Sequence, residues 1–261
     1  MRLDLSGKHA LVCGGSDGIG RAAAIELAQL GANVTLLARR EDVLREAVAA
    51  LPTHDTQRHG FLVADVSQRQ ALGDAVSALA SDRPVHVLVD NAGGPPGGAA
   101  HAAGIDAYLD AFNRHLLANH TLLQAVLPGM RAARWGRIVN VISTSVYEPI
   151  PNLGVSNTIR GAVASWAKTL SRELGADGIT VNNVLPGYTR TQRLDQILGD
   201  RSTATGKTQE EVAGGMLASV PVGRFAEAGE IGGVIAFLCT PAAAYVNGQS
   251  LAVDGGRMQS I

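Results

Sequence analysis

The sequence predicts a doubly wound α/β protein, with about seven parallel strands and helices on both faces of the sheet. Three observations predict it. Short aliphatic runs alternate with longer helical patterns from end to end, and these runs are apolar on both faces, as strands of a covered parallel sheet are. A glycine-rich turn joins the first run to the first helix. Because no linker or shift in composition divides the 261 residues, we expect one domain over residues 1–261.

The expected strands are short and rich in Val, Leu, Ile and Ala: Ala10–Cys13, Val34–Leu37, Phe61–Ala64, Val85–Val89, Arg137–Ile142, Thr180–Leu185 and Ser250–Val253. The helical patterns between them have apolar residues three and four positions apart: Arg21–Leu30, Arg40–Ala50, Ser67–Ala80, Tyr108–Met130, Asn157–Leu174 and Glu230–Leu238. Gly31 follows the first of these, where a left-handed residue commonly ends a helix.

Two stretches are expected to be irregular. Gly93–Gly104 (GGPPGGAAHAAG) follows a strand, at the place where loops that contact ligands lie. Tyr188–Val220 is polar and rich in Thr, and it is long enough to form a lid over a substrate pocket.

Composition narrows the function classes. Lys+Arg is 22 against Asp+Glu 23, so no basic surface predicts nucleic acid or an anionic membrane as a partner. The start of the sequence lacks the apolar stretch of a signal peptide, and no segment is apolar over the length of a membrane span, so we expect a cytoplasmic protein. Cys13 and Cys239 are expected to be reduced core thiols, and no metal site is predicted.

The first strand runs into Cys13-Gly14-Gly15-Ser16-Asp17-Gly18-Ile19-Gly20, and a helix follows at once. A pyrophosphate binds to backbone N–H groups at a helix N-terminus, which side chains would obstruct. Gly14, Gly18 and Gly20 provide that clearance. We therefore expect a dinucleotide site of the Rossmann type formed by Gly14, Ser16, Asp17, Gly18, Ile19 and Gly20. A tight turn that holds no ligand is the alternative.

The G-x-x-x-G-I-G spacing resembles the short-chain dehydrogenase/reductase superfamily, in particular its 3-oxoacyl-(acyl-carrier-protein) reductase-like members. The resemblance covers nearly the whole chain, because Asp90-Asn91-Ala92-Gly93 resembles the family's N-N-A-G segment and residues 223–225 and 245–256 resemble its C-terminal signature. It implies that Asp65 and Val66 contact adenine. It also implies further cofactor contacts from Asn91, Ala92, Gly93, Pro186, Gly187, Thr189 and Thr191.

The end of the second strand indicates which dinucleotide binds. NAD-selective sites have a carboxylate there for the ribose 2′-hydroxyl, whereas a 2′-phosphate requires positive charge. This sequence has Ala38, Arg39 and Arg40, which favours NADP(H) over NAD. Asp17 weakens the argument, because many NADP-dependent relatives have a basic residue at that place. Alternatively, Arg39 and Arg40 merely solvate the start of a helix.

Carbonyl reduction in this family uses a Ser that orients the carbonyl, a Tyr thirteen positions later that donates the proton, and a Lys four positions beyond the Tyr. An Asn on an earlier helix completes a water relay. Ser143 occupies the serine place, but Ser156 stands at the tyrosine place, Arg160 at the lysine place and His115 at the asparagine place. The resemblance therefore implies a catalytic site with three of its four residues changed.

These changes alter the chemistry, because a serine hydroxyl is a much poorer acid than a phenol and Arg cannot shuttle protons near neutral pH. Arg160 beside Ser156 suggests a corner that binds an anion such as a carboxylate or an enolate. The candidate proton donors are His115, with a reference pKa near ~6.5, Tyr147 and Tyr188. The alternatives are that His115 fills a helix interface, that the tyrosines are pocket wall, and that Ser156 is a helix N-cap.

Three functions fit the sequence. The first is an NADP(H)-dependent oxidoreductase that acts on a small carbonyl or alcohol. The second is a non-redox lyase or isomerase that uses Ser143 and Arg160, and the third is a catalytically silent nucleotide-binding protein. By family analogy we expect a homotetramer or homodimer, paired through Tyr108–Met130, Asn157–Leu174 and the region of the last strand. No feature of the sequence names the substrate.

Overall fold

The computed structural model describes residues 1–54 and 56–260, and this part of the chain contains one seven-stranded sheet with the order β3-β2-β1-β4-β5-β6-β7. Every neighbouring pair is parallel. The strands are β1 His9–Cys13, β2 Asn33–Ala38, β3 Gly60–Val63, β4 Val87–Asp90, β5 Gly136–Val141, β6 Ile179–Pro186 and β7 Ser250–Val253. The predicted fold class is confirmed, and each predicted strand lies within two residues of an observed one.

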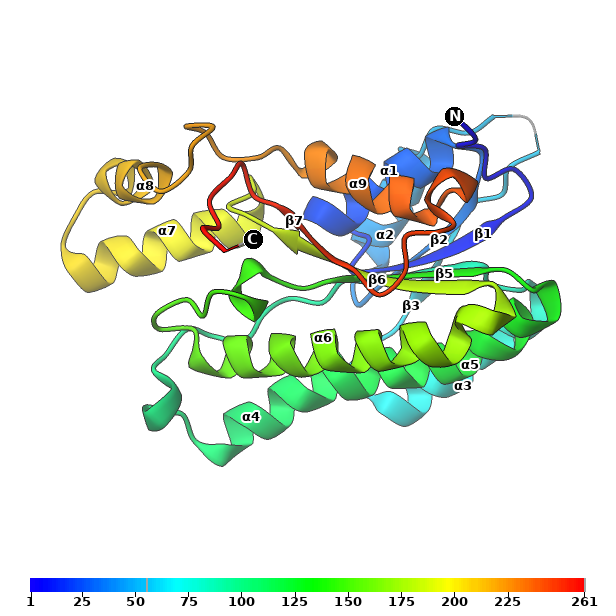
Figure 1. Ribbon diagram of the computed structural model, residues 1–261, viewed down its shortest axis with the longest axis horizontal. Helices are drawn as coiled ribbons and strands as arrows, with labels where there is room; N and C mark the ends of the chain where they lie inside the picture. The colour runs from blue at the N-terminus through cyan, green and yellow to red at the C-terminus, as the bar shows by residue number, and fades with distance from the viewer. Residues whose placement is uncertain (55, 261) are drawn as a thin grey trace.

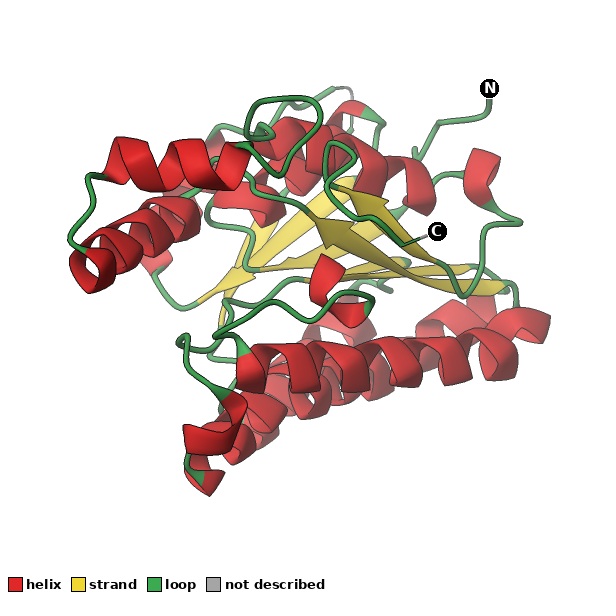
Figure 2. Ribbon diagram, turned by 60° about the vertical axis from the view of Figure 1, so that its left-hand side comes forward, coloured by secondary structure: helices red, strands yellow, loops and turns green. Residues whose placement is uncertain are grey.

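Helices cover both faces of the sheet (Figure 1, Figure 2). One face carries α1 (Gly18–Gln29), α2 (Glu41–Ala49) and α9 (Ala228–Cys239). The other carries α3 (Arg69–Asp82), α5 (Ala118–Ala133) and α6 (Gly154–Leu174). This three-layer arrangement buries the sheet on both sides and explains why its strands are almost wholly apolar.

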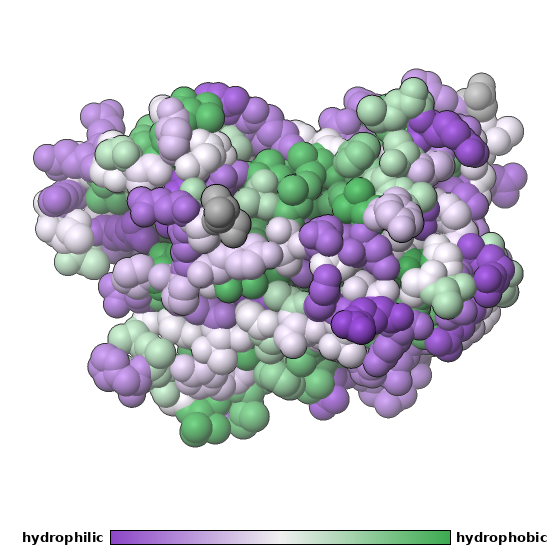
Figure 3. Space-filling view, in the orientation of Figure 1, coloured by the Kyte–Doolittle hydropathy of each residue, from purple (hydrophilic) through white to green (hydrophobic). Residues whose placement is uncertain are grey.

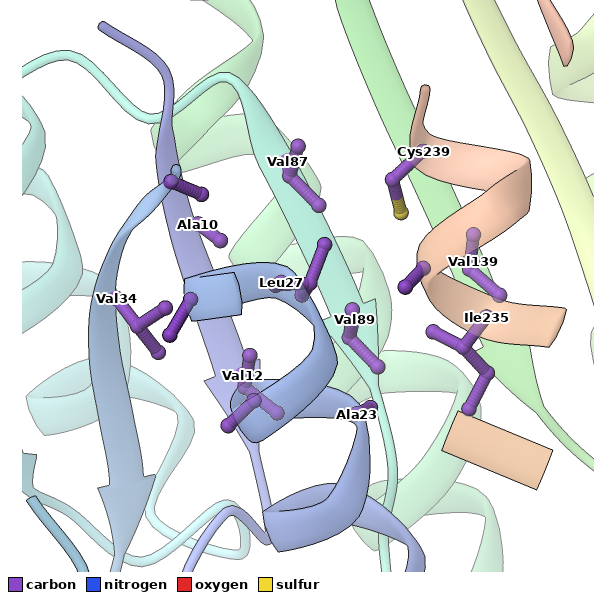
Figure 4. Close-up of a cluster of buried hydrophobic side chains, with 14 of the residues drawn as sticks. Ala10, Val12, Ala23, Leu27, Val34, Val87, Val89, Val139, Ile235 and Cys239 are labelled. Carbon is purple, nitrogen blue, oxygen red and sulfur yellow. The ribbon is translucent and has the colours of Figure 1, made fainter. Parts of the chain in front are cut away.

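The core of the first layer lies between α1, α9 and the central strands (Figure 4). Leu27 of α1 and Ile235 of α9 are fully buried against the strand valines. The two helices approach closely at Gly232, where a Cβ atom would lie 2.8 Å from the carbonyl carbon of Ala22. Glycine is required there because larger side chains would push α9 away from α1.

The helix expected over Tyr108–Met130 is divided into α4 (Ile105–Phe112), a π-helical turn (Asn113–Leu117) and α5. The division is local, because the chain continues in helical conformation on both sides of the π-turn. His115, one of the predicted site residues, lies within this turn and is buried. Such π-turns frequently lie at functional sites.

The expectation of an irregular segment at Tyr188–Val220 is wrong. The segment contains α7 (Gln192–Thr205) and α8 (Gln209–Leu217), which project beyond the ends of the strands (Figure 1, Figure 2). Leu194, Val212 and Met216 pack with Phe225 in a small core of their own. This packing holds both helices although their sequences are rich in weak helix formers.

Four 3₁₀ turns complete the described part of the chain: Ala100–Ala102, Thr144–Val146, Gly175–Asp177 and Pro241–Ala243. The Gly93–Gly104 stretch is otherwise irregular, as expected. Cys13 and Cys239 are buried and unpaired, as expected. None of the helices in the described ranges is long and apolar enough to cross a membrane.

Candidate active site

A cavity of about 740 Å³ lies where the sheet order reverses, at the carboxyl ends of β1, β2 and β4. Ligands of open α/β sheets bind at this switch point. Nine of the seventeen predicted cofactor residues line the cavity: Gly14, Ser16, Arg39, Arg40, Asp65, Val66, Asn91, Ala92 and Gly93. Segments far apart in the sequence therefore meet around one space.

The glycine turn at one end of this cavity has a backbone that only glycine permits. Gly14 has a φ of 58°, and a Cβ atom on it would lie 2.5 Å from the carbonyl oxygen of Asn91. A Cβ atom on Gly20 would collide with the carbonyl oxygen of Gly14. The turn and the N-terminus of α1 thus approach each other without side chains between them, which is the geometry that a pyrophosphate requires.

The other eight predicted cofactor residues do not line the cavity. Gly18, Ile19 and Gly20 form the first turn of α1, and the exposed Asp17 is its N-cap residue. Thr191 touches the glycine turn, because its Cγ2 lies 3.1 Å from the place of a Cβ atom on Gly18. The remaining three, Pro186, Gly187 and Thr189, precede Thr191 on the chain, and Gly187 lines a separate, smaller pocket.

Positive charge gathers at the end of the cavity beside β2. Arg39 and Arg40 both line it, and in the described ranges neither lies within 4.0 Å of a carboxylate. A hydrogen bond from the backbone N–H of Ser67, 2.9 Å long, lowers the pKa of Asp65, and the charges of Arg39 and Arg114 act in the same direction. Arg114 also lines the cavity, and sequence reasoning missed it.

Ser143 lies directly after β5 and begins the 3₁₀ turn Thr144–Val146. Its hydroxyl oxygen accepts a 3.1 Å hydrogen bond from the backbone N–H of Ser145. Because a hydroxyl carries one donor and two acceptor sites, the proton of Ser143 remains free to be donated to another group. A carbonyl oxygen is a suitable acceptor.

Ser156 is not the N-cap of α6. The helix begins at Gly154, with Leu153 as its N-cap, so Ser156 is already the third helical residue. The helix begins early because the backbone N–H of Gly154 donates to the carbonyl of Gly98, 2.9 Å away, which anchors the chain there. One turn further along α6, Arg160 lies on the same side of the helix as Ser156.

Arg160 is buried, with 8% of its surface exposed. Its Nη1 donates to the carbonyl of Val141 (2.7 Å) and its Nη2 to that of Ala92 (3.3 Å), so the guanidinium bridges the ends of β5 and β4. Burial, and then repulsion from Arg193, lowers the pKa of Arg160 to about 10. The side chain therefore keeps its positive charge at neutral pH.

His115 is 4% exposed. Burial, followed by the charges of Arg160 and Arg114, lowers its pKa to about 3, and a hydrogen bond to the carbonyl of Gly93 opposes the shift only in part. The reference pKa near ~6.5 that made His115 a candidate proton donor therefore does not apply, because the histidine lies next to a buried cation and not in water. At neutral pH His115 is an uncharged imidazole.

The two tyrosines named as proton donors lie in different surroundings. Tyr147 ends the turn that follows Ser143, and 54% of its surface is exposed. Tyr188 packs edge-on against Phe225, with ring centroids 6.3 Å apart, and the guanidinium of Arg257 lies 4.8 Å from the centroid of its ring. These two contacts fix the ring of Tyr188 as a part of the protein wall.

Sequence reasoning missed two further polar residues near the site. Asp90, at the end of β4, is 3% exposed, and neither carboxyl oxygen has a hydrogen-bond partner in the described part of the chain. Burial raises its pKa well above 3.8. Arg193, in the first turn of α7, donates to the carbonyl of Pro95. The signal for Asp90 was its place in the N-N-A-G-like segment, whereas Arg193 lay in a segment expected to be irregular.

A doubly wound sheet with a glycine turn and a cavity at its switch point is the architecture of a dinucleotide-binding protein. Residues 14–257 match a family profile described as enoyl-(acyl carrier protein) reductase. The chain is 34% identical over 262 residues to 3-oxoacyl-(acyl-carrier-protein) reductase FabG of Pseudomonas aeruginosa, which covers 99% of this chain and 100% of the relative. It is also 34% identical over 262 residues to a tropinone reductase homolog of Arabidopsis thaliana, covering 98% and 77%.

Among solved structures, L-sorbose reductase from Gluconobacter frateurii, complexed with NADPH and L-sorbose, superposes with a TM-score of 0.93 at 28% identity over 100% of both chains. The chain therefore belongs to the short-chain dehydrogenase/reductase superfamily. The relatives named above are oxidoreductases of carbonyl and alcohol groups.

Proposed function

We propose that this protein is an NADP(H)-dependent oxidoreductase that interconverts a small carbonyl compound and its alcohol. The observation that carries the proposal is one cavity lined by Gly14 of the glycine turn, by Arg39 and Arg40, and by the buried His115. The NADPH complex of L-sorbose reductase, which has the same fold, supports NADP(H) as the nucleotide.

The residues present fit such a dinucleotide. Gly14, Ser16 and the N-terminus of α1 would hold the pyrophosphate, since a Cβ atom would fill the space at this turn. Arg39 and Arg40 would bind a 2′-phosphate, and Asp65 with Val66 would border the adenine. The bound nucleotide would supply the hydride.

Ser143 and Arg160 would have different roles in the reaction. Ser143 would donate its free proton in a hydrogen bond that orients the carbonyl. Arg160, fixed by two backbone carbonyls, would stabilise negative charge on the carbonyl oxygen without giving up a proton. The proton itself would come from water beside Ser156, because the side chain at that position is a hydroxymethyl group in place of a phenol and His115 is neutral at pH 7.

The test is a turnover assay of the nucleotide-loaded protein on a panel of small carbonyl compounds, with nucleotide absorbance as the signal. Ser143→Ala should lower kcat about 100-fold, as loss of an oxyanion-stabilising donor does. Ser156→Ala should change kcat by less than about threefold, because water and not Ser156 delivers the proton. An equal and severe loss for Ser156→Ala would assign the proton to that hydroxyl and contradict the mechanism.

Residues 1–261 would act as one domain in the cytoplasm, with α7 and α8 as a lid over the substrate end of the cavity.

Apolar atoms gather over α9 and, at the lower edge of the view, over α4 (Figure 3). Tyr245, Phe237 and Leu251 are exposed around α9 and β7, which supports a homodimer or homotetramer paired there. Light scattering after gel filtration would test this, and a monomeric mass would contradict it.

A further inference from the structure

Two arginines from different elements hold one short loop at the substrate end of the cavity. Arg160, on α6, donates through Nη2 to the carbonyl of Ala92, and Arg193, on α7, donates through Nη2 to the carbonyl of Pro95 at 3.0 Å. Gly94 lies between these contacts, and a Cβ atom on it would be 3.7 Å from Nη2 of Arg160. Ala92, Gly94 and Pro95 all line the cavity described above, so each guanidinium group holds a backbone carbonyl of its wall.

Neither charge is compensated within the described ranges. No carboxylate lies within 4.0 Å of Arg160 or Arg193. Two acidic residues line the cavity: Asp110 pairs with Arg114 at 2.8 Å, and Asp65 accepts a hydrogen bond from the backbone N–H of Ser67. The positive charge of Arg193 acts on Arg160, because repulsion between the two helps to lower the pKa of the buried Arg160 guanidinium. Two like charges that hold one short loop repel each other, and a bound anion would compensate them.

Arg193 is the better placed of the two to bind an anion. Arg160 is buried and spends donors on two backbone carbonyls, whereas Arg193 is only half-buried. Arg193 also donates through Nη1 to Gln196 at 2.9 Å, which fixes the plane of its guanidinium. A guanidinium has five N–H donors, so it retains further donors in a fork that matches a carboxylate.

We infer that the substrate carries a carboxylate close to its reacting carbonyl, and that Arg193 binds this carboxylate while Arg160 provides the second positive charge. The substrate class is thus a small oxo acid or the corresponding hydroxy acid. This inference rests on the proposed reductase function and names the substrate class of the same site. Arg193 is then the specificity-determining residue, and its helix is part of the lid.

The direct test is calorimetric titration of the NADP⁺-loaded protein with oxamate, which has a carboxylate beside an unreactive amide carbonyl, and with its neutral ester, ethyl oxamate. The wild type should bind oxamate at least about tenfold more tightly than the ester. Arg193→Gln should erase that difference, and Arg193→Lys should restore it in part. Arg201→Gln, on the same helix, is the matched control and should change nothing.

Equal binding of oxamate and its ester by the wild type would overturn the inference. So would an unaltered oxamate affinity in Arg193→Gln, or a comparable loss of NADPH affinity in that variant, which would assign Arg193 to the nucleotide. Turnover separates this result from the proposed function. Reduction of oxo esters as fast as oxo acids would leave the reductase standing without the carboxylate site. Tight binding of oxamate combined with no NADPH oxidation by any oxo acid of the panel would retain the carboxylate site and remove the reductase.

Discussion

The two halves of the site are built in different ways. The nucleotide half, from β1 through α1 to β2, is formed mainly by backbone, and a Cβ atom on Gly14 or Gly20 would meet other main-chain atoms. The catalytic corner, where β4, β5 and α6 meet, is formed by the side chains of Ser143, Arg160 and His115. On the motif correspondence proposed above, the first half would keep the pattern of the superfamily and the second would depart from it.

The difference teaches where change is tolerated. A glycine turn cannot accept side chains without moving the strand and helix that it joins. A side chain on a helix can be exchanged while the helix stays in place, and α6 here presents Arg160 to the carbonyls of Val141 and Ala92. If the proposed corner is catalytic, its chemistry would differ from that of the superfamily on the same fold.

The largest expected effect is in the nucleotide half. Gly20→Val should weaken NADPH binding by at least about 1000-fold, because the new side chain would collide with the carbonyl of Gly14. Gly215→Val is the control, since nothing lies within 4 Å of a Cβ atom there. Isothermal titration gives the affinities, and circular dichroism shows whether each variant is folded. A folded Gly20→Val protein with normal affinity would remove the turn from nucleotide binding.

A substitution that raises kcat tests the catalytic half of the site. Ser156→Tyr places a phenol where the superfamily has its proton donor, and general acid catalysis contributes ~10²–10⁴-fold. With Arg160 in place of a Lys, we expect the lower end of this range, a rise in kcat of about 100-fold. Ser156→Phe fills the same space without a proton and should give no rise. Equal rates for the two variants would show that proton supply does not limit turnover.

Nucleotide selectivity should show an intermediate effect. Arg39→Ala should weaken NADPH binding about 10- to 100-fold and leave NADH binding nearly unchanged, because a charge-assisted contact to the 2′-phosphate is lost. Arg45→Ala is the control, since this arginine lies on the adjacent helix α2 and pairs with Glu41. Fluorescence titration with both nucleotides measures the ratio. Equal affinities of the wild type for NADPH and NADH would contradict the assignment of Arg39.

The smallest expected effect is on the free energy of unfolding, through the buried Asp90 at the end of β4. Because burial raises the pKa of Asp90 above 3.8, the folded protein holds this proton more tightly than the unfolded chain does. The stability contribution is fully present below pH ~3.8 and falls by at most about 1.4 kcal/mol per pH unit as the pH rises towards the folded-state pKa.

Asp90→Asn removes this titration. The variant should therefore gain stability relative to the wild type as the pH rises above about 4, measured by urea unfolding at several pH values. The exposed Asp195→Asn is the control and should follow the wild-type profile. A constant difference between Asp90→Asn and the wild type at all pH values would mean that Asp90 is not a buried titrating acid.

Periodicity located the sheet and most helices, because strands buried on both faces leave an unmistakable apolar run. It failed for α7 and α8, whose polar, Thr-rich sequences are held by contacts with Phe225 that no local pattern reveals. One local signal was available. Thr208 and Glu211 form a capping box at the start of α8, and the spacing of these two residue types is readable from sequence.

The site shows the same division between residues that a local sequence pattern reveals and residues that only the fold brings together. The glycine turn and the Arg39-Arg40 pair could be placed from spacing alone, and both line the cavity. The charge state of His115 could not be predicted from spacing, because it depends on burial and on the charges of Arg160 and Arg114. Arg193 is brought to Pro95, 98 residues away in sequence, only by the fold.

The central claim is that hydride reaches a carbonyl held by Ser143. The most direct test is to give the protein NADPH deuterated at the transferring position of the nicotinamide, together with an oxo acid, and to analyse the product by mass spectrometry. We expect a hydroxy acid that carries one deuterium at the former carbonyl carbon and an equal amount of oxidised nucleotide. Conversion of the substrate without deuterium in the product and without oxidation of NADPH would contradict it.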